Sequence, residues 1–150
     1  MSKPTLILTV GLPRSGKSTY LRTRWPRGIL PIVCPDEIRR YLGCFPFAQH
    51  MEPFVWWVAR LMVEVLFAAG CNEVALDATN VTKRRRDEWK SDKWTRSYYV
   101  FDTPVDECID RARSGGKDYL VPVIQRMARD ADWMGEFFQP DFPEPFIFVK

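Results

Sequence analysis

A short glycine-rich stretch, GLPRSGKST at residues 11–19, constrains this chain more than any other feature of its sequence. It follows the apolar run TLILTV, which is typical of a buried strand, and it leads into KSTYLRTRW, which is typical of a helix. The stretch matches the pattern G-x-x-x-x-G-K-[ST] in the strand–loop–helix setting that the pattern requires. A chance match in an ordinary strand–helix turn is the alternative. The sequence therefore predicts a phosphate-binding loop at the end of a first strand.

Each residue type in this loop has a physical role in holding a phosphate. The glycines let backbone N–H groups turn inward, and the positive end of the following helix attracts the anion. Lys17 is expected to reach the β- and γ-phosphates, and the Ser18 hydroxyl is expected to bind Mg²⁺. The predicted nucleotide-binding residues of the loop are Gly11, Pro13, Arg14, Ser15, Gly16, Lys17, Ser18 and Thr19. The loop predicts a nucleoside triphosphate with magnesium, but not what happens to the phosphate.

Strand-like and helix-like segments alternate along the chain. The expected strands are 5–10, 29–34, a run within 72–77, 97–102 and 145–150, and the expected helices are 17–25, 36–42, 53–69, 82–94, 103–113 and 122–134. This alternation predicts a mostly parallel sheet covered on both faces, in an α/β three-layer sandwich of the P-loop NTPase type with a small lid. With 150 residues, of which 46% are hydrophobic, the chain is expected to form a single domain over residues 1–150.

Two prolines sharpen these expectations. Pro31 weakens the second strand, which is therefore expected to be short or to lie at an edge of the sheet. Thr103 and Pro104 are expected to be the cap and the first-turn residue of the helix that follows the fourth strand. FVWWVARLMVEVLFAAG, the longest apolar stretch, is interrupted by Arg60 and Glu64, and it predicts a core helix.

Polar segments follow the second and third expected strands, where parallel sheets bind their ligands. Asp36 and Arg39 lie three residues apart at the start of a helix, so they share a face. The carboxylate can accept a proton from an attacking hydroxyl, and the arginine can grip a phosphate beside it. A helix-capping aspartate with a solvated arginine is an equal alternative. Asp77, at the end of the third strand, can hold Mg²⁺ or orient the loop, although Thr79 and Asn80 also suit a purely structural turn.

Basic residues gather in two later places. The run KRRR at residues 83–86 is either a solvated helix face or a basic wall for nucleic-acid phosphates. Arg111, Arg113 and Lys117 flank the pair Gly115–Gly116. Cations on a mobile glycine loop over the nucleotide would form a lid that neutralises charge on the transferring phosphoryl group. The alternative is a helix C-terminus whose dipole favours basic side chains.

The order of these segments resembles the 5′-kinase domain of bacteriophage polynucleotide kinase and the small P-loop kinases around it. The likeness rests on GLPRSGKST, PDEIR, LDATN with KRRRDEW following, YYVFDTPVDECIDRARSGG and VPVIQRM, and it runs from Thr5 to about Met134. The combination of D-x-x-R, D-x-T-N and F-D-x-P after three successive strands is more specific than the phosphate loop alone. The family's second lid arginine falls at Gly115 in this chain, with Arg113 and Lys117 nearby.

The resemblance implies ATP and Mg²⁺ as cofactors and a role for each matched residue. Asp36 would be the general base on a 5′-hydroxyl, and Arg39 would contact the phosphoryl group or the acceptor's phosphate. The implied catalytic residues are Asp36, Arg39, Lys17 and Arg111; Asp77 and Arg113 would join the nucleotide site, and Ser18 and Asp77 would bind the metal.

The acceptor remains open at this point. The leading hypothesis is a nucleic-acid substrate, DNA or RNA, phosphorylated at its 5′-hydroxyl end. The alternatives are a hydroxymethylated pyrimidine base in DNA, a nucleoside or small molecule, and an ATP-driven switch without an acceptor. Asp36 followed by Arg39 favours a positioned hydroxyl over a water molecule.

Composition narrows the setting further. A net charge of +3 fits a polyanionic partner without requiring one. The four cysteines are scattered without a C-x-x-C pair, so neither a disulfide framework nor a zinc site is expected. No apolar run is long enough for a signal peptide or a membrane span. These features predict a cytoplasmic protein that does not interact with membranes, and the resemblance adds a phage-encoded enzyme in the host cytoplasm; an oligomer is left open.

Overall fold

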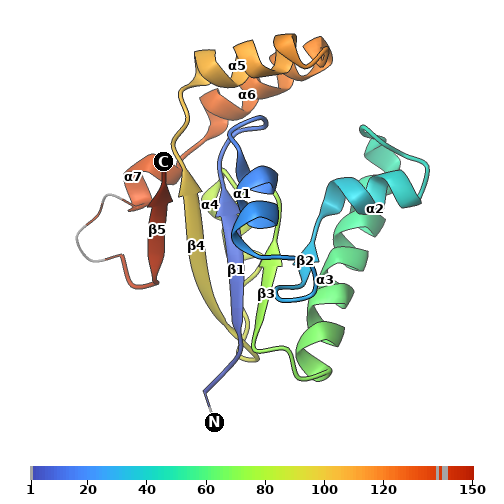
Figure 1. Cartoon of the computed structure of the whole chain (residues 1–150), viewed down its shortest axis with the longest axis vertical. Coiled ribbons are helices and arrows are strands. Elements are labelled where there is room, and N and C mark those ends of the chain that lie inside the picture. Colours follow the sequence, from blue (N-terminus) through green and yellow to red (C-terminus); the bar gives the residue numbers. More distant parts are fainter. Residues whose placement is uncertain (1, 138, 140–141) are drawn as a thin grey trace.

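A five-stranded sheet forms the centre of the computed structural model, which describes residues 2–137, 139 and 142–150 (Figure 1). The strands are β1 (Thr5–Val10), β2 (Ile32–Val33), β3 (Glu73–Leu76), β4 (Thr95–Phe101) and β5 (Phe146–Val149), arranged in the order β2-β3-β1-β4-β5. Every pairing in the sheet is parallel. Parallel sheets are stable only when both faces are covered, and the helices between the strands provide that cover.

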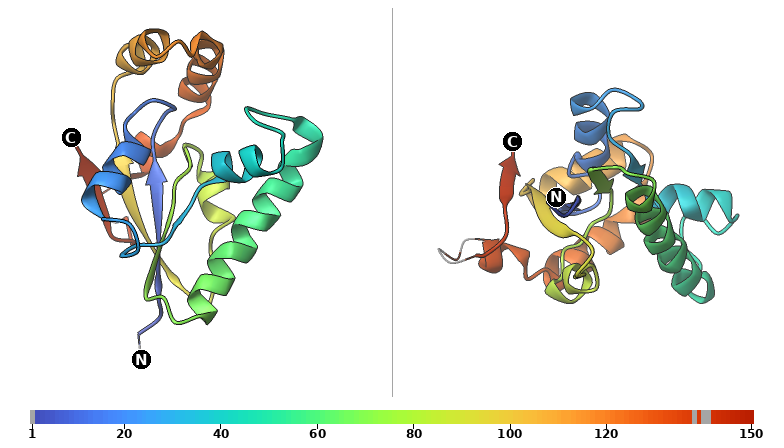
Figure 2. Two further views of the ribbon diagram at one scale, coloured as in Figure 1. Left: turned by 45° about the vertical axis from the view of Figure 1, so that its right-hand side comes forward. Right: turned by 90° about the horizontal axis from the view of Figure 1, so that it is seen from below.

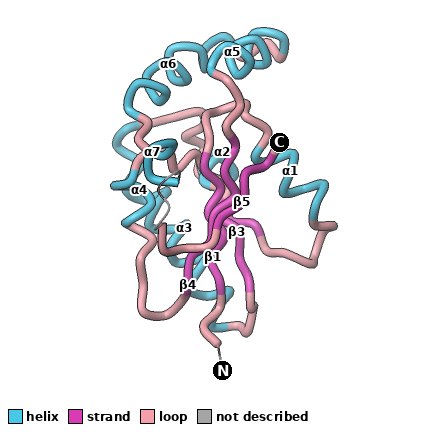
Figure 3. The backbone as a smooth tube through the Cα atoms, turned by 90° about the vertical axis from the view of Figure 1, so that its left-hand side faces the viewer, coloured by secondary structure: helices cyan, strands magenta, loops and turns pink. Residues whose placement is uncertain are grey.

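The helices divide into two covering layers and a hairpin. They are α1 (Lys17–Arg24), α2 (Pro35–Tyr41), α3 (Glu52–Ala68), α4 (Lys83–Asp87), α5 (Val105–Ser114), α6 (Val121–Asp130) and α7 (Trp133–Phe137), with 3₁₀ turns at Gln49–Met51 and Asp118–Leu120. Figure 3 shows α1 on one side of the strands and α4 and α7 on the other. The hairpin of α5 and α6 lies across the carboxyl ends of the strands (Figures 1 and 2). The predicted three-layer α/β fold is confirmed.

The alternation of side chains along β1 produces the two halves of the core. Leu6, Leu8 and Val10 are fully buried in the larger apolar cluster, which includes the inner face of α3. Ile7 points to the opposite face and packs with Leu21 of α1 in a smaller cluster. Because both faces of the strand are apolar, β1 reads as a continuous hydrophobic run in the sequence.

Two tryptophans, one directly after α1 and one in α3, differ in their surroundings. Trp25, which follows α1, stacks on Tyr99 with ring centroids 5.5 Å apart and planes 12° apart, and it packs against the smaller core cluster. The helix α3 contributes Val55, Ala59 and Val63 to the larger core cluster, as expected of a core helix, but it buries only this one face. Its outer stripe is exposed, with Trp57 71% and Val65 57% accessible.

No helix among the described residues is both long and apolar enough to cross a membrane.

Several element boundaries differ from the sequence predictions for identifiable reasons. The second strand spans only two residues at the sheet edge, because Pro31 accepts a ladder bond from Ala75 N–H but has no N–H to donate. The helix expected over 82–94 ends at Asp87. The helix expected over 122–134 begins one residue earlier and breaks at Ala131, which has an extended ψ of 128°. The fourth strand begins two residues before its predicted start, at Thr95.

The start of α5 also corrects the sequence prediction. Pro104, not Thr103, occupies the N-cap position. The Thr103 hydroxyl instead donates a hydrogen bond to the Ser15 carbonyl, at 2.9 Å. A residue expected to cap its own helix therefore ties the end of β4 to the phosphate-binding loop.

Candidate active site

The loop between β1 and α1 requires glycine at two positions, at Gly16 for its backbone conformation and at Gly11 for lack of space. Gly16 has φ 103°, in the left-handed region that favours glycine. A Cβ on Gly11 would lie 2.7 Å from Ser15 Oγ and 2.9 Å from the carbonyl oxygen of Phe101. The Gly11 N–H also donates to the Thr79 carbonyl at 2.9 Å. Both glycines of the sequence pattern are therefore required by backbone geometry, and the loop is fastened to the segment after β3.

Lys17 carries a buried charge, and no carboxylate among the described residues forms a hydrogen bond with it. Its Nζ donates to the Leu12 carbonyl at 2.6 Å and to Ser15 Oγ at 3.3 Å, both neutral acceptors. Burial lowers the pKa of Lys17 to about 8, although the negative charges of Asp77 and Asp36 act in the opposite direction. A phosphate in the loop would supply the counter-charge that this lysine lacks.

Two side chains whose oxygens could bind a metal ion, Ser18 and Asp77, form a hydrogen bond with each other. The Ser18 hydroxyl, in the first turn of α1, donates to Oδ2 of Asp77 at 2.6 Å. Asp77 is the residue directly after β3. Asp77 is only 7% exposed. No cluster of three or more His, Cys, Asp or Glu side chains that could hold a metal occurs in the part of the chain that the structure describes. The hydroxyl–carboxylate pair fits Mg²⁺, which binds through one or two protein oxygens and fills its other positions with phosphate and water.

The rest of the LDATN segment is structural. Asn80 is 1% exposed, with φ 46°, and its Nδ2 donates to the Thr9 carbonyl at 2.8 Å. The Thr9 hydroxyl lies 2.7 Å from the Ala78 carbonyl and 3.2 Å from the Leu76 carbonyl, and it donates its single hydrogen to one of them. These bonds shape the turn after β3, so that Asp77 points to the phosphate loop while the residues after it hold the backbone.

Asp36 and Arg39 are brought together as the sequence predicts, with a third residue that it did not predict. Arg39 Nη1 donates to Asp36 Oδ1 at 2.8 Å. Arg39 Nε and Nη2 donate to the two carboxylate oxygens of Glu52, at 2.8 Å each. The Asp36 side chain remains 55% exposed, whereas that of Arg39 is 13% exposed. The carboxylate is thus open to an incoming acceptor, and the arginine is held from behind.

The charges of this cluster stabilise one another. Burial opposes the charge of Arg39, but the hydrogen bonds and charge of Glu52, together with the charge of Asp36, outweigh it and raise the pKa of Arg39. The hydrogen bond from Arg39 lowers the pKa of Glu52, despite partial burial. No local signal marks Glu52, because an acidic residue in a helix's first turn is common. Only the packing of α3 against α2 places it there.

Arg111 lies against the phosphate loop. Its Nη1 donates to the Arg14 carbonyl at 3.2 Å, and Arg14 Nη2 reaches back to the Arg111 carbonyl at 3.4 Å. Arg111 Nη1 is 3.8 Å from where a Cβ on Gly16 would lie, and Arg111 is paired with Glu107. The predicted lid arginine is therefore beside the predicted nucleotide site.

The other predicted lid cations lie elsewhere. Arg113 is two residues further along α5, and residues two apart on a helix do not share a face. It is exposed, and so is Gly115. A Cβ on Gly115 would lie 3.1 Å from Arg14 Nη2, so the space next to this glycine is used by an arginine of the phosphate loop. Lys117 lies beyond the end of α5, between the glycine pair and the next 3₁₀ turn.

The basic run at the start of α4 is mostly neutralised. Arg86 is 2% exposed and pairs with Asp132 and Glu136. The first and third residues of the run pair with acids of the same helix region at 2.6 Å, as Lys83–Asp87 and Arg85–Glu88. Arg84 is 93% exposed and has only a 3.9 Å contact with Glu88. These contacts favour the solvated-face interpretation of the run, with one buried arginine that joins α4 to α7.

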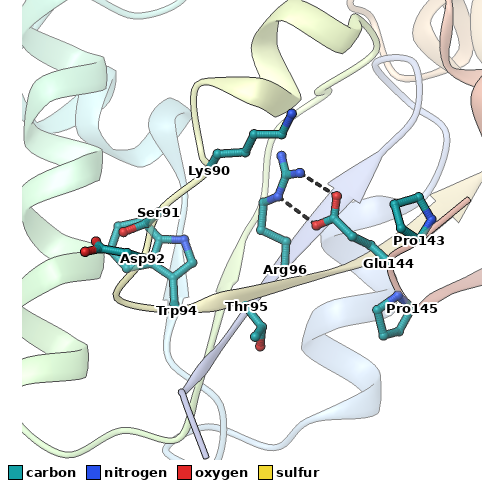
Figure 4. Close-up of a pocket in the computed structure, with 9 residues that line it drawn as sticks. All are labelled: Lys90, Ser91, Asp92, Trp94, Thr95, Arg96, Pro143, Glu144 and Pro145. Atoms are coloured by element: carbon teal, nitrogen blue, oxygen red, sulfur yellow. Dashed lines mark hydrogen bonds and ion pairs between the residues drawn. The ribbon is translucent and has the colours of Figure 1, made fainter.

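A hollow of about 690 Å³ lies away from these groups (Figure 4). It is lined by the segment before and at the start of β4 and by residues 143–145. Arg96 donates there to both carboxylate oxygens of Glu144, at 2.8 and 2.5 Å. Because the hollow surrounds the start of β4, it lies at the opposite end of the strands from the phosphate loop. It is therefore no part of the candidate active site.

Comparisons with known proteins place this geometry among kinases. No family model and no curated protein sequence matches the chain. Among solved structures, a chain of a Pnkp1/Rnl/Hen1 complex is 28% identical with a TM-score of 0.65; the match covers 74% of this chain and 40% of that one. A chain of the Pnkp1/Rnl/Hen1 RNA repair complex is 21% identical with a TM-score of 0.66, over 89% of this chain and 48% of that one. The present chain thus spans less than half the length of these two proteins.

A small-molecule kinase matches over a larger share of its own length. The Mycobacterium tuberculosis APS kinase CysC, solved in complex with AMPPNP and APS, is 16% identical with a TM-score of 0.60, over 100% of this chain and 91% of that one. At this identity the likeness shows the fold alone. Together the comparisons support a P-loop kinase and do not specify its acceptor. The chain has the fold of the P-loop kinases, and within that fold it resembles the kinase domain of polynucleotide kinase.

Proposed function

We propose that this protein transfers the γ-phosphoryl group of ATP to a hydroxyl of a nucleic acid, most simply the 5′-hydroxyl end of DNA or RNA. The observation that carries the proposal is the Asp36–Arg39 pair, joined by a 2.8 Å hydrogen bond, in the helix that follows β2. The strand β2 is the next but one in the sheet to β1, which leads into the phosphate loop. A switch that hydrolyses ATP has no need of a carboxylate and an arginine held for an acceptor. A kinase needs both.

In this proposal, five of the predicted site residues have the following tasks. Lys17 binds the β- and γ-phosphates, whose charge compensates its own, and the loop backbone holds the remaining oxygens. Ser18 and Asp77 would hold Mg²⁺, which neutralises phosphate charge when bound. Asp36 accepts the proton of the attacking hydroxyl. Arg111, which donates to the Arg14 carbonyl of the phosphate loop, would contact the transferring group as a lid cation.

The exposure of Asp36 supports a polymeric acceptor over a free nucleoside. Its carboxylate is 55% exposed, so an acceptor can approach without being enclosed. A nucleoside kinase would instead surround its acceptor. The likeness to chains of the Pnkp1/Rnl/Hen1 assemblies also supports a nucleic-acid substrate. The same openness suits a hydroxymethylated pyrimidine base in DNA, which remains the second candidate acceptor.

A transfer assay with γ-labelled ATP and magnesium tests the proposal. The acceptors are a 5′-hydroxyl oligonucleotide, its 5′-phosphorylated form, an end-blocked strand with internal hydroxymethyl bases, and free nucleosides. We expect label on the first of these and not on its phosphorylated form. Label on the modified strand alone would move the acceptor to the base. Label on nucleosides alone, or release of free phosphate alone, would refute a nucleic-acid kinase.

A further inference from the structure

The guanidinium of Arg39 is held from two sides. Glu52 accepts from Nε and Nη2, and Asp36 accepts from Nη1, all at 2.8 Å. A guanidinium has five N–H groups, so these bonds leave one on Nη1 and one on Nη2. Each of these remaining N–H groups can donate to an oxygen of a phosphate. The arginine can therefore still bind an anionic group while it donates to Asp36 and Glu52.

Glu52 is itself fixed in place. Its Oε2 accepts a hydrogen bond from Trp56 Nε1, one helical turn later, at 3.1 Å. The Glu52 side chain is 18% exposed, and it begins α3, where the helix dipole favours a carboxylate. The guanidinium of Arg85, from α4, lies over the Trp56 ring, 4.1 Å from its centroid. Three helices thus support one carboxylate, which grips Arg39 on the edge away from Asp36.

We propose that Glu52 is a positioning residue for the phosphoryl transfer, which holds the Arg39 guanidinium so that the Asp36 carboxylate stays free to accept the acceptor's proton. This inference rests on the proposed function of Asp36 and Arg39. It adds a residue from a different helix that does not itself touch the acceptor.

The reason lies in competition between two carboxylates for one guanidinium. A bidentate arginine–carboxylate pair is stronger than a single hydrogen bond. With Glu52 present, that pair forms behind the site, and Asp36 receives only one bond. Without it, Asp36 is the carboxylate left within reach of the freed Nε–Nη2 edge. Arg39 would then occupy both oxygens of the base and turn its remaining N–H groups away from the acceptor.

The substitution Glu52→Gln tests this arrangement with little change in shape. The amide keeps one acceptor oxygen but presents N–H groups to the guanidinium, so the bidentate grip is lost. We expect kcat/KM for the acceptor to fall about 10–100-fold, the usual effect of losing a supporting partner behind a reacting group. The KM for ATP should not change. Glu64→Gln is the matched control, because it removes the same charge from α3 at a residue that pairs with Arg60 and Lys93.

A double-mutant cycle separates positioning from general structural support. If Glu52 acts through Arg39, Glu52→Gln should cost little more once Arg39 has been changed to lysine, which cannot form the bidentate pair. Additive losses in the two variants would overturn the proposal. So would a Glu52→Gln enzyme that matches Glu64→Gln in both acceptor kinetics and ATP kinetics.

A third measurement does not depend on turnover. In proton NMR spectra, the Arg39 Nε–H resonance is assigned by its loss in Arg39→Lys. We expect this proton to be protected from hydrogen exchange with water in the wild-type protein and in Glu64→Gln, and to exchange faster in Glu52→Gln. Unchanged protection in Glu52→Gln would refute the positioning role even if the protein proved to phosphorylate no tested acceptor. Conversely, wild-type protein that labels no acceptor would refute the proposed function while this resonance still reports on the grip of Glu52.

Discussion

The buried Lys17 and the half-buried Arg39, two cations of the site, are held in opposite ways. Lys17 donates to a carbonyl and a hydroxyl, and burial lowers its pKa to about 8. Arg39 donates to two carboxylates, whose hydrogen bonds and charges raise its pKa against the effect of burial. The first cation lacks a direct anionic partner, while the second already has two.

This difference teaches how the two halves of the site are prepared for their ligands. The nucleotide half is the phosphate loop, residues 11–19, which presents backbone N–H groups and the buried charge of Lys17. Bound phosphate would offset the free-energy cost of burying that charge. The acceptor half consists of Asp36, Arg39 and Glu52, whose opposite charges are paired before any ligand binds. Preorganised side chains position an acceptor without further ordering. If the comparison is correct, changes in the two halves should affect different measured quantities.

The largest effect should follow removal of the acceptor-half carboxylate. We expect Asp36→Ala to lower kcat by about 10²–10⁴-fold, the usual contribution of a general base, while ATP still binds. Steady-state kinetics and nucleotide titration together measure this. Glu37→Ala is the control, because Glu37 is the next residue of α2 and pairs with Arg40 at the surface. A loss of less than tenfold in Asp36→Ala would contradict the role of base, and lost ATP binding would contradict the separation of the halves.

The next effect concerns the stability of the ligand-free protein as the pH changes. The unfolded-state pKa of lysine is 10.5 and that of folded Lys17 is about 8, so the buried charge costs about 3 kcal/mol at neutral pH. As the pH rises through 8, the folded protein releases this proton while the unfolded chain keeps it. Stability attributable to Lys17 therefore rises with pH and levels off above 10.5.

Lys17→Met isolates this contribution, because the variant has no proton to lose. We expect its stability advantage over the wild type, measured by urea unfolding, to shrink as the pH is raised from about 7 to about 10. A difference that stays constant over this range would show that Lys17 already has adequate compensation. The contrast with Arg39 would then fail.

The same contrast explains what could be predicted from the sequence. The phosphate loop is a local pattern, in which Gly11, Gly16, Lys17 and Ser18 are fixed by spacing alone, and Asp77 follows from the end of a recognisable strand. The partner of Arg39 is 13 residues away, beyond an irregular segment, and depends on how α3 packs against α2. Helix ends were also missed where tertiary bonds decide them. Asp132, in the break after α6, accepts bonds from Lys83 N and Arg86 Nη2 that a continuous helix would not place there.

The smallest of these effects tests whether the nucleotide half is built from close backbone contacts. In Gly11→Ala the new methyl group would meet Ser15 Oγ at 2.7 Å and the Phe101 carbonyl at 2.9 Å, and the carbonyl cannot rotate away. We expect a loss of about 1–3 kcal/mol in unfolding free energy. The KM for ATP should also rise, because relief of the clash moves the loop.

Gly135→Ala is the matched control for this variant. Among the residues that the structure describes, and apart from its own helix and chain neighbours, a Cβ at Gly135 in α7 meets no atom within 4 Å, so the same substitution should be neutral or stabilise the protein by up to about 1 kcal/mol. Equal effects of the two substitutions would mean that the loop yields without cost. In that case close backbone contacts would not make the phosphate loop rigid. The acceptor half, in which Arg39 is bonded to two carboxylates, would then be the more rigid of the two.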